Sequence, residues 1–324
     1  GPGRAVAQLK IQKARYGAKV FLNGHFVGEH GPNFTPGWFD VRPMLKPDGA
    51  ENELVVCLGA SLAQVPAYLT EGWDYEKTRY IPGIYDSVEL ILCDTPHVVN
   101  VQIVPDVEKR CVRAVIELAS PATTPVKGTV HERKSGRVVG TATGAASAAS
   151  LVDLTIPIRN GRLWTPEDPF LYELEVETGG DNYRTRFGLR SFSTDPATGR
   201  ALLNGRPYFL RGASVCINRF FEDAVRADLP WDRDWVRALH RKFKEMHWNS
   251  LRYCIGFPPE RWYEIADEEG ILIQDEFPVW YGGDKDQWPK TIMADHLAVE
   301  YTEWMRERWN HPCVVIWDAQ NETY

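Results

Sequence analysis

The last third of the chain constrains its fold most, because strand-like and helix-like segments alternate there. Strand-like runs cover residues 208–212, 250–254, 271–275 and 313–317, and a helix-like segment separates each run from the next. Parallel neighbours need a long crossover connection, usually a helix, whereas antiparallel neighbours need only a turn. The alternation therefore predicts a parallel sheet, either doubly wound or closed into a barrel.

The helix-like segments carry start and stop signals. Asp232 is a predicted N-cap, and the second helix starts after Pro258-Pro259 and stops at Gly270. Apolar residues follow Asp232 at spacings of three and four, which is the period of a helix face. These residues are Val236, Leu239, Phe243 and Met246.

The residues before about position 195 indicate strands and turns. Asn23-Gly24 lies between two apolar runs, and this dipeptide favours the positive φ values of a two-residue hairpin turn. After Pro96, apolar residues alternate with period 2, as in a small sandwich. We predict a multidomain β plus α/β chain with three domains, at residues 1–95, 96–194 and 195–324.

Composition excludes several partners and sites. The 37 Lys and Arg residues are scattered among 44 Asp and Glu, for a net charge of −7, so we expect no nucleic acid as partner. No apolar run approaches the roughly 18 residues that span a bilayer, so we expect no membrane partner either. The six cysteines form no CxxC pair, so no metal is expected, and most should be buried thiols.

Polar residues collect at the ends of the four predicted parallel strands, in residues 212–216, 252–254, 275–276 and 318–322. Side chains at these ends line one site, because all strand-to-helix loops gather on that face. The ends supply an arginine and several carboxylates, and nine of the 12 tryptophans lie at or after position 231. This set indicates cleavage of a glycosidic bond by paired carboxylates. The second carboxylate is not evident from the sequence.

The chain stops at Tyr324, directly after its fourth predicted parallel strand. Four strand–helix units cannot close a barrel of eight, and the open edge would leave backbone groups unpaired. We therefore expect an internal piece of a longer enzyme, without the C-terminal half of the barrel and the start of the first β domain. The compartment stays open, with secretion or the periplasm as options.

Three segments carry a family resemblance. Residues 20–30 read V-F-L-N-G-H-F-V-G-E-H, residues 187–192 read F-G-L-R-S-F, and residues 309–322 read W-N-H-P-C-V-V-I-W-D-A-Q-N-E. They resemble motifs of glycoside hydrolase family 2, the β-galactosidase, β-glucuronidase and β-mannosidase family. The resemblance implies a partial jelly roll, an immunoglobulin-like β-sandwich and the first half of a (β/α)8 TIM barrel.

The resemblance also implies an activity and two roles. It predicts a retaining exo-β-glycosidase that removes terminal β-linked sugars by double displacement, without a cofactor. Glu322 would be the general acid/base, and Asn321 would hold the 2-hydroxyl of the sugar in the cleaved unit. The nucleophilic glutamate of the family ends the seventh strand, which lies beyond Tyr324, so the sequence names none.

Five further residues are candidate substrate contacts, each with a structural alternative. Arg252 is expected either to contact the sugar or to brace the barrel through Asp275 or Glu276, and each carboxylate has the same two options. Trp280 and Trp317 are the candidates for stacking on sugar rings, with packing in the core as their alternative.

The sequence departs from the family where the sugar is chosen. Family members often carry pocket histidines after the first two strands, but residues 214–216 and 253–258 contain none. We predict packing roles for Cys216 and Cys254. The alternative function is therefore a non-catalytic carbohydrate-binding or scaffold protein on the same fold. A carbohydrate is the expected partner in both cases, and homo-oligomerisation is left open.

Overall fold

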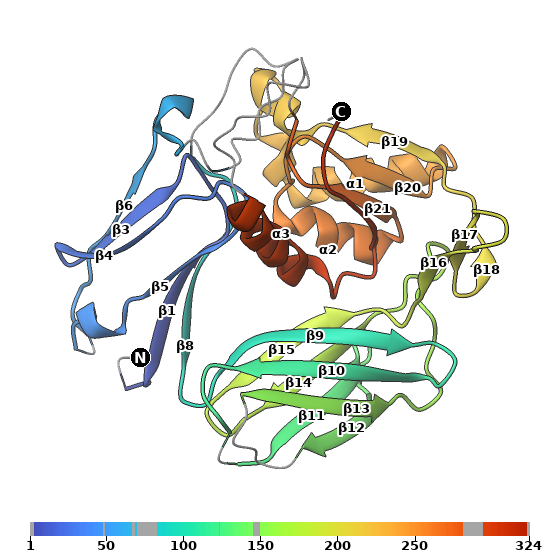
Figure 1. The fold of residues 1–324 in the computed structure, drawn as a ribbon, viewed down its shortest axis with the longest axis horizontal. Coiled ribbons are helices and arrows are strands. Elements are labelled where there is room, and N and C mark those ends of the chain that lie inside the picture. The colour runs from blue at the N-terminus through green and yellow to red at the C-terminus, as the bar shows by residue number, and fades with distance from the viewer. Residues whose placement is uncertain are drawn as a thin grey trace.

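The computed structural model describes residues 3–47, 49–66, 69, 83–122, 124–144, 150–280 and 294–322. Three parts follow one another from blue to red in Figure 1, two made of strands and one that contains the long helices. Among the described residues, none of the helices combines the length and apolar character that a membrane crossing requires.

The first part consists of short antiparallel strands. They are β1 (Val6–Ile11), β2 (Ala14–Arg15), β3 (Ala18–Leu22), β4 (His25–His30), β5 (Gly37–Asp40), β6 (Leu54–Leu58), β7 (Gly83–Ile84) and β8 (Val88–Cys93), with the 3-10 helices η1 (Arg42–Met44) and η2 (Leu62–Gln64). The sheets have the orders β5-β1-β8, β4-β3-β6 and β2-β7. Leu9 and Val20, from different sheets, share one core. The hairpin predicted at Asn23-Gly24 is confirmed, with φ values of 53° and 81°.

The second part is a pair of antiparallel sheets around one core. Its strands are β9 (Val98–Asp106), β10 (Cys111–Leu118), β11 (Val126–Glu132), β12 (Val138–Gly144), β13 (Leu151–Pro157), β14 (Tyr172–Glu177) and β15 (Asn182–Phe187). The sheet orders are β13-β10-β9 and β12-β11-β14-β15. Inward residues of both sheets, such as Ile116 and Leu174, are fully buried in the same cluster, as the period-2 pattern predicts.

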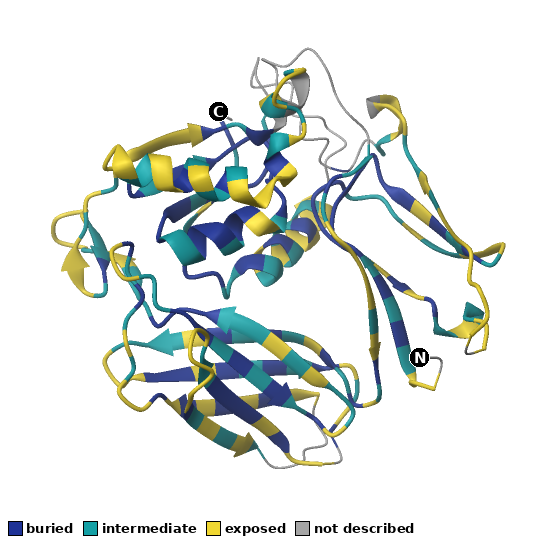
Figure 2. Cartoon of the chain, turned by 180° about the vertical axis from the view of Figure 1, so that it is seen from behind, coloured by how far each residue is buried: buried dark blue, intermediate teal, exposed yellow. Residues whose placement is uncertain are grey.

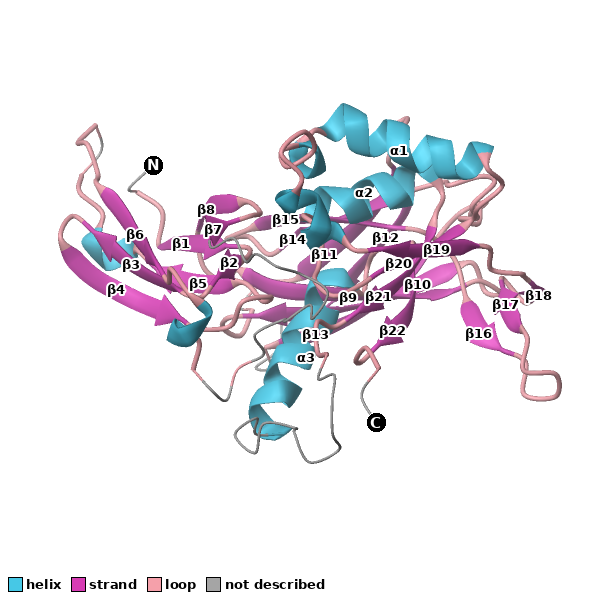
Figure 3. Cartoon of the chain, turned by 90° about the horizontal axis from the view of Figure 1, so that it is seen from above, coloured by secondary structure: helices cyan, strands magenta, loops and turns pink. Residues whose placement is uncertain are grey.

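A small antiparallel sheet links the second part to the third. It consists of β16 (Phe192–Thr194), β17 (Ala201–Leu203) and β18 (Arg206–Pro207). The third part then contains β19 (Gly212–Val215), η3 (Ile217–Glu222), η4 (Leu229–Trp231), α1 (Arg233–Glu245), β20 (Ser250–Tyr253), α2 (Glu260–Glu269), β21 (Leu272–Glu276), α3 (Ala294–Arg308) and β22 (Val314–Asp318). Its helices α1 and α2 lie side by side (Figure 3).

The predicted parallel sheet is confirmed. Its order is β19-β20-β21-β22, and all three pairings are parallel. Because the strand order follows the chain order, these four strands lack the reversal point of a doubly wound sheet. The helix signals also hold, since Asp232 accepts hydrogen bonds from Asp234 N and Trp235 N, and Gly270 ends α2 with a φ of 74°.

The prediction of a first parallel strand at 208–212 is wrong in its position, because β19 spans Gly212–Val215. The side chain of Asn249 binds the backbone of the residues just before β19, donating to Phe209 O and accepting from Arg211 N. These bonds occupy backbone groups that a ladder would use. Pairing therefore begins at Gly212, where the close Ser250 carbonyl leaves no room for a Cβ.

The helices cover one face of the parallel sheet. Tyr253 and Ile273 point to this face and are buried with Val236 of α1 and Trp262 of α2. Buried segments, dark blue in Figure 2, occur in both the strands and the helices of this part. Successive side chains of a strand point to opposite faces. Arg252 and its strand neighbours therefore lie on the other face, which α1, α2 and α3 do not cover.

The seam between the second and third parts is closely packed. Trp164 donates from Nε1 to Asp267 O at 2.9 Å, and Arg190 donates from Nη2 to Val314 O at 2.6 Å. A Cβ on Gly188 would stand 2.6 Å from Pro312 Cβ, so only glycine fits between these parts. The segments 187–192 and 309–322 thus pack against each other, and the first of them connects the second part to the third.

Candidate active site

Arg252 is the centre of a charged cluster at the carboxyl edge, the edge of the sheet at which β19 to β22 end. Its guanidinium donates to three side chains: to Glu276 Oε2, to Asn321 Oδ1 at 2.9 Å and, from Nε, to Asp318 Oδ2 at 3.2 Å. These partners come from the ends of β21 and β22. Arg252 therefore ties three neighbouring strands together, and its side chain remains 29% exposed.

Glu276 is the buried member of this cluster. Its side chain has no exposed surface, and Oε1 accepts a hydrogen bond from Ile255 N at 2.9 Å. Burial raises the pKa of Glu276 to about 7, against the opposing effects of the Ile255 N–H group and Arg252. The carboxyl thus exchanges its proton near neutral pH, which is a property common at functional sites.

Asn321 and Glu322 follow the end of β22. Asn321 is buried, and its backbone N donates to Val279 O at 2.8 Å, while its side chain accepts the bond from Arg252. Glu322 is exposed and has a φ of 42°, in the left-handed region that few non-glycine residues adopt. The chain therefore turns at Glu322 immediately beyond the residue that Arg252 holds.

Asp275 and Trp317 lie on the opposite face of the sheet from Arg252. Asp275 is fully buried and accepts hydrogen bonds from Tyr263 OH at 2.6 Å and Trp304 Nε1 at 2.7 Å, and Arg308 Nε lies 3.4 Å away. Trp317 pairs with Asp275 in register, and its ring centroid is 5.0 Å from that of Trp304. The geometry favours the bracing option for Asp275, and it places Trp317 against Trp304 on the helix face with 37% of its surface exposed.

Trp280 differs from Trp317 in its position. Its backbone forms an isolated parallel bridge with Asn321, so it stands beside the residue that precedes Glu322, and it is partly exposed. Of the two tryptophans named from the sequence, Trp280 is the one at the carboxyl edge next to the Arg252 cluster.

Two members of this cluster, Gln274 and Asp318, are not among the predicted substrate contacts, although Asp318 lies in the predicted strand end 318–322. Gln274 donates from Nε2 to Asp318 Oδ2 at 2.7 Å, so Asp318 is shared between the amide and Arg252. A period-2 count could have found Gln274, because it lies on the same face of β21 as Glu276. Asp318 is in register with Glu276 only because the ladder shifts after Ile273, which no sequence pattern reveals.

A cavity lies on the helix-free face of the parallel sheet, next to the Arg252 cluster. It has a volume of about 300 Å³ and is lined by Gly212, Ser214, Arg252, Gln274 and Ile316, among others. Arg252 and Gln274 thus border both the cavity and the carboxylates at the strand ends.

A second charged cluster surrounds His311, which precedes β22. Nδ1 of His311 lies 2.6 Å from Asp267 Oδ2, and Nε2 lies 2.7 Å from Glu260 Oε1. Burial alone would lower the pKa of His311, but the two carboxylates outweigh it and raise that pKa to about 10. The ring is therefore a buried imidazolium at neutral pH, and it joins the two ends of α2 to β22.

Asp267, His311 and Cys313 also lie close enough together to be considered as metal ligands. Both ring nitrogens of His311 already face carboxylates, and burial raises the pKa of the Cys313 thiol well above its usual value. A metal needs a neutral imidazole and a thiolate. The electrostatics of this group fit an ion pair and do not fit a metal site.

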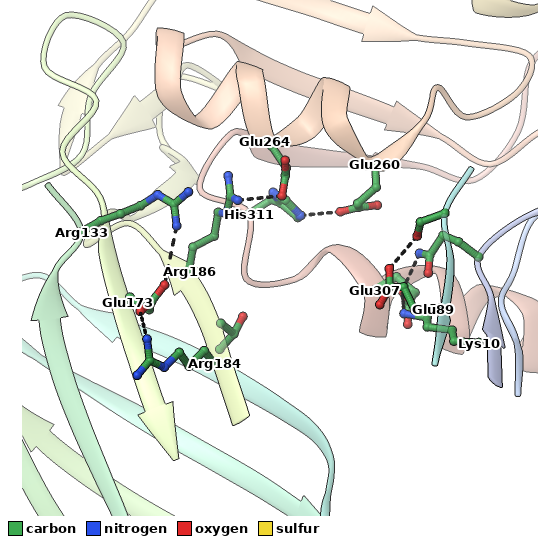
Figure 4. A pocket seen from close by; sticks show the side chains of 13 residues that line it. Lys10, Glu89, Arg133, Glu173, Arg184, Arg186, Glu260, Glu264, Glu307 and His311 are labelled. Carbon is green, nitrogen blue, oxygen red and sulfur yellow. Dashed lines mark hydrogen bonds and ion pairs between the residues drawn. The ribbon is translucent and has the colours of Figure 1, made fainter. Parts of the chain in front are cut away.

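A polar cavity of about 290 Å³ lies where the three parts meet, next to His311 (Figure 4). Glu173 lies between Arg133 and Arg184, and Arg186 donates to Glu264 Oε1 at 2.6 Å. Arginines, a lysine and glutamates around the cavity form ion pairs, although Glu260 Oε2 has no hydrogen-bond partner. These ion pairs stabilise the junction of the three parts. Positive and negative side chains balance in the lining, so it offers a ligand no excess charge of one sign.

Sequence profiles of known families match two consecutive regions. The profile described as "Glycosyl hydrolases family 2" matches residues 96–190, and that described as "Glycosyl hydrolases family 2, TIM barrel domain" matches residues 197–324. The two regions adjoin at the seam formed by residues 187–192.

Curated relatives are similar over nearly the whole chain. The β-galactosidase large subunit of Lactobacillus helveticus is 25% identical over 348 residues, which covers 98% of this chain and 51% of that protein. The β-galactosidase of Thermoanaerobacter pseudethanolicus is 28% identical over 323 residues, covering 94% and 40%. The chain thus spans about half the length, or less, of these relatives.

A solved structure shares the fold. The β-glucuronidase of Ruminococcus gnavus in complex with a C6-substituted uronic isofagomine superposes with a TM-score of 0.75 at 22% identity, over 98% of this chain and 55% of that one. At this identity the likeness supports the arrangement of the three parts and does not identify the sugar.

Proposed function

The chain belongs to glycosyl hydrolases family 2, and from this premise we propose that the protein is a retaining exo-β-glycosidase. It would hydrolyse terminal β-linked sugars of oligo- or polysaccharides, as a β-galactosidase or β-glucuronidase does. Glu322 is its general acid/base in a double displacement. The named relatives are glycosidases, which supports the reaction class.

The contact between Arg252 and Asn321 carries the proposal. The residue next to the proposed acid/base is held by a guanidinium that is itself fixed by Glu276 and Asp318. Such a chain of contacts sets where Glu322 leaves the strand, and orientation of a reacting group is worth a large part of catalysis. Arg252 is a positioning residue in this account, and Asn321 is the proposed contact to the sugar.

In the first step a nucleophilic carboxylate attacks the anomeric carbon and bonds to the sugar, while the carboxyl of Glu322 donates its proton to the departing glycosidic oxygen. In the second step the resulting carboxylate takes a proton from water, which attacks the sugar–enzyme intermediate. No residue of the described part of the chain is assigned as this nucleophilic carboxylate. Trp280, beside Asn321, is the proposed stacking surface for the sugar ring.

The three parts have proposed boundaries at residues 1–95, 96–194 and 195–324. We assign them as a jelly-roll-like part, an immunoglobulin-like sandwich and strands one to four of a (β/α)8 barrel. The chain-ordered parallel sheet with helices on one face supports the barrel assignment. Two facing antiparallel sheets around one core support the sandwich assignment.

The role of Glu322 is tested in protein that includes the nucleophilic carboxylate, with the variant Glu322→Gln and aryl β-glycosides of graded leaving-group acidity. For poor leaving groups, kcat/KM should fall by about 10²–10⁴-fold, the usual contribution of a general acid. For dinitrophenyl glycosides, which need little protonation, the rate of the first step should change far less. Burst and steady-state kinetics separate the two steps.

Glu245→Gln is the matched control, because Glu245 is an exposed carboxylate on α1, paired with Lys242. This variant should hydrolyse glycosides with poor and with good leaving groups at the wild-type kcat/KM. An equal loss for all leaving groups in Glu322→Gln would contradict the acid role. Carbohydrate binding without turnover of any aryl glycoside, in protein that includes the nucleophilic carboxylate, would support the non-catalytic alternative instead.

A further inference from the structure

Two thiols meet at the carboxyl edge of the sheet. Cys216 directly follows β19 and Cys254 directly follows β20. The strands are parallel neighbours with Val215 opposite Tyr253, so the two cysteines are the next residues on adjacent strands. Their Sγ atoms are 3.1 Å apart.

This placement suits a disulfide. Adjacent strands lie about 4.8 Å apart, and disulfides usually join Cα atoms that are roughly 4.4–6.8 Å apart. Bond formation needs the sulfurs to approach to about 2.05 Å, so each side chain has to move by only about half an ångström from the observed contact. No rearrangement of the ladder between β19 and β20 is required.

The two thiols differ in access. Cys254 is buried, with 2% of its surface exposed, whereas Cys216 is partly exposed. Two effects raise the pKa of the Cys254 thiol: the hydrogen bond with Cys216, which is the larger, and burial. An oxidant in solution therefore meets Cys216 first, and Cys254 is placed to complete the reaction.

We propose that Cys216 and Cys254 form a modification site, a dithiol that small disulfides such as oxidised glutathione convert to an intramolecular disulfide. The Cys216 thiolate attacks one sulfur of the small disulfide, forms a mixed disulfide and expels one thiolate. That thiolate takes the proton of Cys254, which attacks the Cys216 sulfur and expels the second small thiol. Two protein thiols and one small disulfide thus yield one protein disulfide and two small thiols.

The site adjoins the Arg252 cluster. Cys254 is followed by Ile255, whose N–H donates to Glu276 and whose φ of 53° is unusual for a β-branched residue. A bond at Cys254 would therefore restrain the backbone that supplies this donor. Cys313, a buried thiol in the same part, has Tyr263 O at 3.6 Å as its contact and serves as an internal control.

The test incubates the native protein with oxidised glutathione, quenches in acid, alkylates remaining thiols in denaturant and maps peptides by mass spectrometry. We expect a cross-linked peptide that joins Cys216 to Cys254, with Cys313 fully alkylated, and dithiothreitol should restore both thiols. Cys254→Ser should stop at a mixed disulfide of glutathione on Cys216. Cys216→Ser should leave Cys254 alkylatable after denaturation.

Three results would overturn the proposal. One is wild-type protein that keeps both thiols after exposure to an oxidant that modifies Cys216 in Cys254→Ser. Another is glutathione that remains on Cys216 in the wild type. The third is a bridge from Cys216 or Cys254 to any other cysteine.

Discussion

The Arg252 and His311 clusters each place a cation between two carboxylates in the third part of the chain. They differ in whether the cation makes a further hydrogen bond and in how much of its side chain is exposed. Arg252 lies between Glu276 and Asp318 and also donates to Asn321, with 29% of its side chain exposed. His311 uses both ring nitrogens on carboxylates, and only 10% of its side chain is exposed.

The difference separates positioning from bracing. The His311 cluster joins α2 to the start of β22, and neither ring nitrogen of His311 is left to bind a ligand. The Arg252 cluster lies on the helix-free face and extends through Asn321 to Glu322. Similar ion pairs therefore stabilise the fold in one place and, in our proposal, aim a reacting group in the other.

The largest expected effect is the loss of activity in Arg252→Ala, measured in protein that includes the nucleophilic carboxylate. Without the guanidinium, Asn321 loses its hydrogen-bond donor, and displacement by about 1 Å can cost roughly 10²-fold in rate. Stability should change by less than about 2 kcal/mol, because a Glu276 that already titrates near pH 7 can take up a proton instead of remaining an unpaired charge. Steady-state kinetics and urea unfolding of the same preparation measure both quantities.

Arg237→Ala is the matched control for Arg252→Ala. Arg237 also pairs with two carboxylates, Glu268 and Glu269, and its side chain is 21% exposed, but it lies on α1. It should lower stability by about 1 kcal/mol or less and leave kcat/KM unchanged. Similar kinetic losses in both variants would remove the distinction between the two clusters.

The next effect concerns stability and pH at His311. Because the pKa of His311 is raised from 6.5 to about 10, its stabilisation is fully present below pH 6.5 and is lost as pH rises toward 10. His311→Gln should cost about 3–5 kcal/mol at pH 6.5, as expected when one partner of a buried pair is removed. The difference between the two proteins should shrink at pH 10, which urea unfolding at both pH values measures.

His240→Gln is the control for this pH dependence. His240 is fully buried on α1, and burial lowers its pKa to about 4. Its contribution is present above pH 6.5 and is lost as pH falls, so it should add no slope between pH 6.5 and 10. A His311→Gln penalty that stays constant over that range would mean that the ring is not charged in the fold.

Local patterns predicted the features that depend on local physics. The Asn23-Gly24 turn, the Asp232 cap, the Gly270 stop and the parallel alternation each need only neighbouring residues. The position of Glu322 after the fourth parallel strand came from the same alternation together with the motif. These features were enough to predict the fold class and the edge of the sheet at which the candidate site lies.

Features set by register between strands could not be predicted. A strand pattern tells which residues share a face and does not tell which face meets the helices, so Asp275 and Trp317 were candidates beside Glu276. The contact between Cys216 and Cys254 depends on the pairing of β19 with β20. The ion pairs of His311 could not be predicted, because its two carboxylates are 44 and 51 residues away in sequence.

The most direct measurement is the configuration of the product that Glu322→Ala forms with azide from an activated aryl β-glycoside. In protein that includes the nucleophilic carboxylate, the variant should still form the glycosyl–enzyme intermediate but hydrolyse it slowly, because no base activates water. Azide needs no base, so it should accelerate turnover and give a glycosyl azide with the configuration of the substrate, read by NMR. An azide product of inverted configuration would make Glu322 the nucleophile and contradict the proposed acid/base role.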